Sequence, residues 1–132
     1  ELIVVTTPQL MAQKVATRVA DMAKRSFIPL LGVIENMSYF ESDTGEKYNI
    51  FGEGGGEALS DKFGIPLLGK VPISENTNNV ADSGTPLIDQ KNSNTKVQIE
   101  KLINNIAIQL PPIIDETCTG RLAKVFEELS NQ

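Results

Sequence analysis

The feature that most constrains the fold is a pentapeptide that occurs twice in the chain. Ile-Pro-Leu-Leu-Gly stands at residues 28–32 and again at residues 65–69. Each copy begins a short, mostly apolar run, which is typical of a strand covered on both faces of a sheet. The proline lies at the start of the run, where a strand tolerates a missing N–H group. A third apolar run, at residues 2–7, precedes both copies, so we predict three buried strands.

Helical patterns separate these strands. Large apolar residues recur at spacings of four, four and three within residues 9–25, at Met11, Val15, Val19 and Met22. Such spacings are typical of one face of an amphipathic helix. Residues 55–63 form a shorter helical pattern, and Gly64 follows it at the position of a C-terminal cap. The order strand, helix, strand, helix, strand predicts an α/β fold with a parallel sheet and right-handed crossovers.

The rest of the chain extends this pattern. A polar loop at residues 74–86 leads to a predicted helix at residues 95–110, which Pro111 and Pro112 end. The apolar stripe of that helix is Ile99, Leu102, Ile103, Ile106 and Leu110. Because a thin parallel sheet needs cover on its faces and edges, we expect residues 1–110 to be the second half of a larger domain. Residues 111–132 are expected to be an appended tail with a helix, whose stripe at residues 122–129 serves either core packing or a partner.

Composition excludes several classes of function. Seventeen acidic against twelve basic residues give a net charge of −5, which disfavours binding to nucleic acid or anionic membranes. No apolar run approaches the roughly 20 residues of a membrane span, and no secretory signal is visible, so a cytoplasmic protein, or one of an organelle stroma or matrix, is expected. Histidine is absent, and the single cysteine, Cys118, cannot form a disulfide or a cysteine cluster within one chain. We expect Cys118 to be inert.

Polar residues follow the predicted strands at the end where a ligand would bind. In open parallel sheets that end is the carboxyl edge. The segments are residues 6–9 after the first strand, 35–38 after the second and 72–76 after the third. Asn36 is the strongest candidate because a carboxamide donates and accepts together and can pair with the edge of a base. An equally consistent interpretation is that Asn36 caps the turn at the end of its strand.

The stretch FGEGGGEAL, residues 51–59, holds four glycines in five positions and raises the question of a phosphate-binding loop. A Walker loop places a lysine after its last glycine, whereas Glu57 follows Gly56 here. A dinucleotide fingerprint requires a strand directly before the glycines, and residues 46–51 are at best a weak strand. We therefore interpret this stretch as a flexible lead-in to the helix at residues 55–63.

Four ordered motifs carry a family resemblance: VVTTPQ, LGVIENMSYF, IFGEGGGEAL and LGKVPIS…ADSGTPLI. Together they resemble the C-terminal half of the Mrp family over about residues 1–110. These are the ApbC-like ATP-binding proteins of iron–sulfur cluster assembly, relatives of the MinD/ParA ATPases and the nitrogenase iron protein. The resemblance implies a Rossmann-like three-layer P-loop NTPase domain that forms a homodimer around ATP and transfers a [4Fe–4S] cluster to apoproteins.

The resemblance also implies roles for single residues. Asn36 matches the asparagine that reads the adenine edge, a pairing that suits a carboxamide. Pro72 and Ser74 match a segment that packs on adenine and ribose, although many relatives carry aspartate where Ser74 stands. A motif near the nucleotide and the dimer face is matched by Thr7, Pro8 and Gln9. The phosphate loop and the residues that hold Mg²⁺ lie in the family's N-terminal half, so this chain alone is predicted not to hydrolyse ATP.

One departure concerns the cluster. Many relatives carry a C-P-x-C pair where this chain has Glu-Ser-Asp-Thr, residues 41–44. Hydroxyls and carboxylates replace thiolates poorly as iron–sulfur ligands, so we do not expect a cluster to be held at this loop. The family includes members without the pair, so membership is still expected. Two alternatives stay open: a MinD/ParA-like positioning or scaffolding ATPase without a cluster, and a non-catalytic interaction module.

Overall fold

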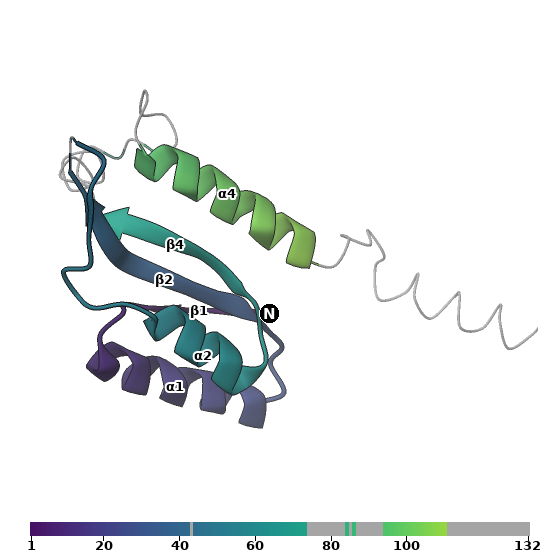
Figure 1. Cartoon of the computed structure of the whole chain (residues 1–132). Coiled ribbons are helices and arrows are strands. Elements are labelled where there is room, and N and C mark those ends of the chain that lie inside the picture. Colours follow the sequence, from purple (N-terminus) through teal and green to yellow (C-terminus); the bar gives the residue numbers. More distant parts are fainter. Residues whose placement is uncertain (43, 74–83, 85, 87–93, 111–132) are drawn as a thin grey trace, which may run out of the picture.

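The computed structural model describes residues 1–42, 44–73, 84, 86 and 94–110. Its elements, in chain order, are β1 (Leu2–Thr6), α1 (Leu10–Arg25), β2 (Leu30–Glu41), β3 (Lys47–Tyr48), α2 (Gly55–Phe63), β4 (Leu67–Ile73) and α4 (Asn94–Gln109). β2 lies at the centre, parallel to β1 on one side and to β4 on the other. Helices α1 and α2 cover one face of the sheet and α4 covers the opposite face (Figure 1). The predicted three-layer α/β fold is confirmed.

Several sequence-based predictions fall outside the described residues. These are Ser74, most of the loop at residues 74–86, Cys118, and the tail at residues 111–132 with its helix.

β2 is longer than the sequence predicted. The strand was expected to end near Asn36, but it continues to Glu41. Met37 has a left-handed backbone with φ of 54°, and the pairing with β4 shifts its register after Asn36, so the strand bends there without ending. Beyond the bend, β2 pairs with β3 in the antiparallel sense. The sheet is therefore parallel except for this short hairpin, whose strands are followed and preceded by Ser42 and Thr44.

Helix α1 presents an unexpected face to the sheet. The sequence pattern correctly predicted a helix, but the large side chains that defined the pattern are exposed: Met11 by 74%, Val15 by 58%, Val19 by 41% and Met22 by 51%. The buried residues are instead Ala16, Ala20 and Ala23. Small side chains allow α1 to approach β1 and α2 closely, which turns the large apolar stripe outward.

The core lies between the sheet and the helices α1 and α2. Its buried members are Val4, Ala16, Ala20, Val33, Leu59 and Phe63. Full burial of one such large side chain stabilises the fold by roughly 1.5–3 kcal/mol. Helix α2 has the predicted bounds, and Gly64 ends it in the left-handed conformation that the cap prediction requires.

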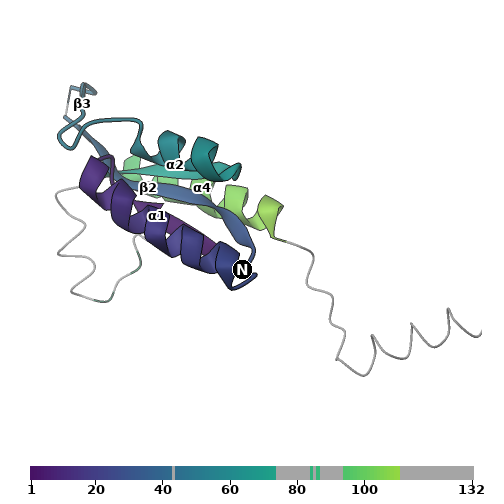
Figure 2. The same ribbon diagram turned by 90° about the horizontal axis from the view of Figure 1, so that it is seen from below.

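On the other face, α4 packs closely on β4. A Cβ built on Gly69 would lie only 3.1 Å from Leu102 Cδ1, and Asn105 Nδ2 donates a hydrogen bond to the Leu68 carbonyl at 2.7 Å. The predicted stripe of α4 is only partly buried, because Leu102 lies in the interface whereas Ile103 and Leu110 are each 47% exposed. Seen from the side of α1, helix α4 lies behind the sheet, where it packs on β4 (Figure 2).

Candidate functional site

The carboxyl ends of the three parallel strands meet at one edge of the sheet, as predicted. Thr6 of β1 pairs with Glu35 of β2, and Glu35 pairs in turn with Lys70 of β4, so the three residues form a row across the sheet. One step further along, Asn36 pairs with Val71. The motifs that are far apart in the sequence therefore converge on a single rim, which we call the strand-end rim, residues 6–9, 35–38 and 70–73.

Asn36 is half-buried on this rim. Its Oδ1 accepts a hydrogen bond from the Met37 N–H at 2.9 Å, which is the local contact that the capping interpretation predicts. A carbonyl oxygen has two lone pairs, so this bond orients the carboxamide and leaves one lone pair and the amide donors available for a ligand. Asn36 also lines a cavity of about 420 Å³ between β1 and α1, together with Thr6 and Thr7.

The β1 exit carries an unsatisfied hydroxyl. Thr7 Oγ1 is buried and has no hydrogen-bond partner among the described residues. Leaving a buried polar group unpaired costs about 1–3 kcal/mol, so such an atom marks a place where a ligand or water would bind. The neighbouring groups are already paired, since Thr6 Oγ1 donates to the Thr7 carbonyl at 3.0 Å and Gln13 Nε2 donates to the Pro8 carbonyl at 2.7 Å.

The other candidate residues differ in exposure. Gln9 stands at the N-cap of α1 with an exposed side chain that makes no capping hydrogen bond. Pro72 is buried in β4, one residue beyond the partner of Asn36. The rim thus offers one exposed amide, one oriented amide and one hydroxyl that no other described residue pairs, a set that fits a ligand held by hydrogen bonds.

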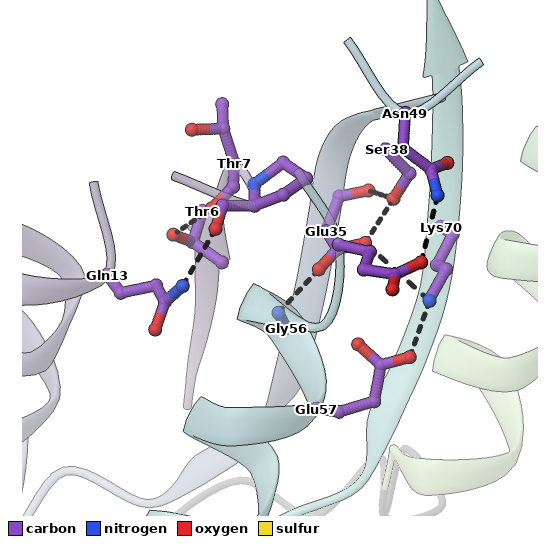
Figure 3. A network of polar contacts seen from close by, with 11 residues as sticks. Thr6, Thr7, Gln13, Glu35, Ser38, Asn49, Gly56, Glu57 and Lys70 are labelled. Atoms are coloured by element: carbon purple, nitrogen blue, oxygen red, sulfur yellow. Dashed lines mark hydrogen bonds and ion pairs between the residues drawn. The ribbon is translucent and has the colours of Figure 1, made fainter. Parts of the chain in front are cut away.

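The glycine-rich stretch also reaches the rim, where it meets Glu35 (Figure 3). The Glu35 side chain is 1% exposed, and its Oε2 accepts a hydrogen bond from the Gly56 N–H at 2.6 Å. Its Oε1 accepts from Ser38 Oγ at 2.5 Å and lies 3.7 Å from Lys70 Nζ. A carboxylate at a helix N-terminus is stabilised by the helix dipole and by the free N–H groups of the first turn. Glu35 therefore occupies the place where a phosphate would bind to α2.

Two glycines are required by this close packing. A Cβ built on Gly55 would lie 2.7 Å from Pro8 Cα, and one built on Gly56 would lie 2.8 Å from Glu35 Cβ. The residue before them, Gly54, has a left-handed φ of 77°, which favours glycine as well. The stretch starts α2 as predicted. The first two helical residues, Gly55 and Gly56, pack against β1 and β2, whereas a Cβ built on Gly52 or Gly54 in the lead-in would meet nothing within 4 Å.

Lys70 connects the buried carboxylate to a second one. Its Nζ lies 2.5 Å from Glu57 Oε1. The pKa of Lys70 is raised, mainly by its hydrogen bond to Glu57. Partial burial lowers this pKa, and the negative charge of Glu35 raises it further. Partial burial pushes the pKa of Glu57 upward, but hydrogen bonds from Lys70 and the backbone outweigh it, so the pKa lies below its usual value. Both groups are therefore charged at neutral pH.

Sequence reasoning missed the role of Glu35. The residue was included only as part of a polar strand end, and Asn36 received the attention. An acidic residue directly after the apolar run LLGVI was the available signal, because charged side chains are rarely buried unless they are paired.

The hydroxyls of Ser42 and Thr44, between β2 and β3, are used for local structure. Ser42 Oγ and Thr44 Oγ1 lie 2.8 Å apart, and the Glu46 N–H donates to Ser42 Oγ at 3.2 Å. Within the described ranges, no group of three or more histidine, cysteine or acidic residues is placed to hold a metal ion. These donors do not fit an iron–sulfur cluster, which thiolates ordinarily hold. In the same ranges, no helix has the length and hydropathy needed to cross a bilayer.

Solved structures define the class of protein. The cell division ATPase MinD of Pyrococcus furiosus superposes with a TM-score of 0.62 over 82% of this chain and 42% of its own, at 23% sequence identity. A nucleotide-binding protein from Archaeoglobus fulgidus, solved in complex with ADP, is 34% identical, with a TM-score of 0.54 over 62% of this chain and 34% of its own. The fold is that of MinD-like P-loop NTPases.

The particular family follows from the sequence comparisons. Residues 1–107 match the family described as "ParA: NUBPL iron-transfer P-loop NTPase", and the chain belongs to that family. An iron-sulfur cluster carrier protein of Deinococcus radiodurans is 46% identical over 87 residues, 65% of this chain and 24% of the relative. The corresponding protein of Pyrococcus furiosus is 42% identical over 109 residues, 79% of this chain and 37% of the relative. The chain thus spans well under half the length of these relatives.

Proposed function

We propose that this chain is the C-terminal portion of an ATP-binding and ATP-hydrolysing iron–sulfur cluster carrier, and that its strand-end rim receives the adenine and ribose of the nucleotide. The observation that carries the proposal is the convergence of Thr7 and Asn36 beside one cavity. Thr7 offers a buried hydroxyl that has no partner among the described residues, and Asn36 offers an oriented carboxamide. The relatives named iron-sulfur cluster carrier proteins support the wider role.

In this proposal each rim residue has its own task. Asn36 pairs with the adenine edge through its amide donor and its second oxygen lone pair. Thr7 and Gln9 supply further hydrogen bonds from the segment after β1, and Pro72 packs against adenine and ribose. Ser74, which lies outside the described residues, is assigned to the same segment by the family resemblance. Phosphate binding and Mg²⁺ belong to residues that this sequence does not contain, so the chain alone binds nucleotide weakly and does not hydrolyse it.

The open side of the sheet supports the proposed domain division. Within the described residues β1 pairs only with β2, and Val5 on this edge strand is 56% exposed. Parallel sheets are normally covered on both faces, and an unpaired edge invites a further strand. We assign residues 1–110 to one half of a P-loop domain whose other half adds a strand to β1 and covers the apolar stripe of α1. Residues 111–132 are assigned to an appended tail.

The proposed whole protein is a homodimer that passes a [4Fe–4S] cluster to apoproteins in the cytoplasm or an organelle matrix. Because the hydroxyls of Ser42 and Thr44 are engaged in a turn, the cluster would be held elsewhere than at this hairpin. The same observation favours a second candidate, a MinD-like scaffolding ATPase without a cluster. Incubation of the full-length protein with iron and sulfide separates the two: cluster absorbance near about 400 nm supports the carrier, and its absence supports the scaffold.

Nucleotide binding is tested by an NMR titration of the chain with ADP. We expect saturable shifts of the Asn36 and Thr7 resonances, and weaker binding in Asn36→Ala. The matched control is Asn105→Ala on α4, which removes a carboxamide that binds the Leu68 carbonyl away from the rim. Shifts spread evenly over the protein, or equal affinity in Asn36→Ala and wild type, would contradict the proposal.

A further inference from the structure

The buried carboxylate of Glu35 has no task in the proposed nucleotide site, yet it is the most completely buried charged group described at the rim. An ionised carboxylate is costly to bury unless donors surround it. Glu35 receives them from three elements: the Gly56 N–H of α2, Ser38 Oγ of β2 and the Lys70 ammonium of β4. A network paired this fully holds its members in fixed positions.

The hydrogen bonds of Ser38 to Glu35 constrain the segment that contains Asn36. Its Oγ donates to the Glu35 side chain and is also 3.2 Å from the Glu35 carbonyl oxygen, so it bridges two atoms of the same residue. The segment between Glu35 and Ser38 consists only of Asn36 and Met37. Met37 there adopts its left-handed backbone, and its N–H holds Asn36 Oδ1. Together, the hydrogen bonds of Ser38 and of the Met37 N–H set both the bend of β2 and the direction of the Asn36 carboxamide.

The glycines extend this rigid unit to β1. Gly56 packs against Glu35 Cβ, and Gly55 packs against Pro8, the residue after Thr7. A shift of Glu35 would therefore move the start of α2 and, through Gly55, disturb the β1 exit. The ends of β1 and β2 therefore both pack against the start of α2.

A fixed carboxamide can distinguish purines, whereas a rotating one cannot. Adenine presents a donor at N6 next to an acceptor at N7, while guanine presents two acceptors, O6 and N7. An amide held in place can accept a hydrogen bond from adenine N6 with its oxygen and donate one to adenine N7 with its nitrogen. With guanine, the same amide oxygen would face the acceptor O6. An amide that is free to turn presents its nitrogen to either base.

We propose that Glu35, acting with Ser38, is a positioning residue that gives the nucleotide site its preference for adenine over guanine. This inference rests on the proposed function, since it assigns the specificity of the same site. Glu35 does not touch the base in this assignment; it acts through the backbone of Asn36 and Met37.

The experiment compares ADP and GDP in NMR titrations of the chain, for wild type, Glu35→Gln and Ser38→Ala. We expect wild type to prefer ADP by roughly tenfold, in line with one good base contact, and both variants to lose most of that ratio. The control is Ser60→Ala, which removes a hydroxyl that donates to the Ile65 carbonyl at 2.6 Å and should leave the ratio unchanged.

The outcomes separate this inference from the proposed function. Wild type without saturable binding of ADP overturns both. Wild type that prefers ADP, with the same ratio in Ser38→Ala and in folded Glu35→Gln, overturns the inference alone, because a purely structural role would weaken both nucleotides equally. Should Glu35→Gln fail to fold, the ratio in Ser38→Ala decides.

Discussion

The glycine junction and the outer edge of β1 lie on the same small sheet but are packed in opposite ways. At the junction, Gly55 and Gly56 leave no space for a Cβ, and every oxygen of the Glu35 carboxylate has a donor. At the edge, Val5 and the large apolar residues of α1 are exposed. Large contiguous apolar surfaces are typical of interaction sites, and the proposed second half of the domain would cover this one. The comparison teaches that close packing in one region of the described chain stands beside an exposed apolar surface in another, which is the contrast that the proposed domain division expects.

The largest difference between the two regions should appear in core truncation. Leu59→Ala in α2 removes a side chain that is 2% exposed and should lower the free energy of unfolding by about 2–5 kcal/mol. Leu10→Ala in α1 makes the same change at a residue that is 65% exposed and should alter it by less than about 0.5 kcal/mol. Urea unfolding of both variants measures the contrast, and similar losses would mean that the edge is covered.

The glycine junction itself is tested by adding one methyl group. Gly55→Ala places a Cβ 2.7 Å from the Pro8 backbone, which cannot move aside as a flexible side chain could. We expect a loss of about 1–3 kcal/mol in the free energy of unfolding. Asp61→Ala on the exposed part of α2 serves as the control and should stay near the wild-type value. A stable Gly55→Ala variant would show that the junction is looser than described.

The open edge is tested through binding. The partner to use is the portion of the Pyrococcus furiosus carrier that this chain does not match. Val15→Lys should weaken its binding by about tenfold, equivalent to about 1.4 kcal/mol, because a charge replaces an apolar contact. Lys62→Ala on α2 should bind like wild type, and calorimetry measures both. Equal binding by Val15→Lys and wild type would remove the α1 stripe from the interface.

The smallest effect concerns pH and the pair Lys70–Glu57. The folded-state pKa of Glu57 is lowered, so its contribution to stability is present above the ordinary value of 4.5 and is lost as pH falls below it. Both side chains are more than one-third exposed, and solvent screening limits the effect to less than about 1 kcal/mol. Urea midpoints at pH 7 and pH 3.5 should differ less in Glu57→Gln than in wild type. An identical difference would show that the pair contributes nothing.

The pH effect has a counterpart in alkali. The pKa of Lys70 is raised, so its contribution is present below the ordinary value of 10.5 and is lost as pH rises through the folded-state pKa. Glu57→Gln should reduce this loss as well, because it removes the main cause of the shift.

The sequence predicted the order of elements because that order depends on local periodicity. The repeated Ile-Pro-Leu-Leu-Gly and the helical spacings between its copies are visible within short windows. The bend at Met37 was not predictable, since nothing in the strand pattern marks a left-handed residue. The exposure of Met11 and Val15 was missed for a related reason. The spacing indicates an apolar face of the helix but not which face packs on the sheet. In the structure, the face that carries the small residue Ala20 is the buried one.

The candidate rim was predictable in part. Strand ends of a parallel sheet meet at one edge, so the convergence of Thr7, Asn36 and Pro72 follows from the element order. The Glu35 network does not, because two of the groups that it binds lie far away in the sequence, one 21 residues away at Gly56 and the other further still at Lys70. Such pairings depend on tertiary packing, which a pattern of single residues does not contain.

The internal anion at the start of α2 has a mechanical consequence. The Gly56 N–H in the first turn of α2 is already bound to Glu35, so the arrival or departure of a phosphate would not change the hydrogen bonding of that group. α2 should therefore keep its position through every stage of a nucleotide cycle. In the proposed nucleotide site, the start of α2 would then be a fixed support for the ends of β1 and β2.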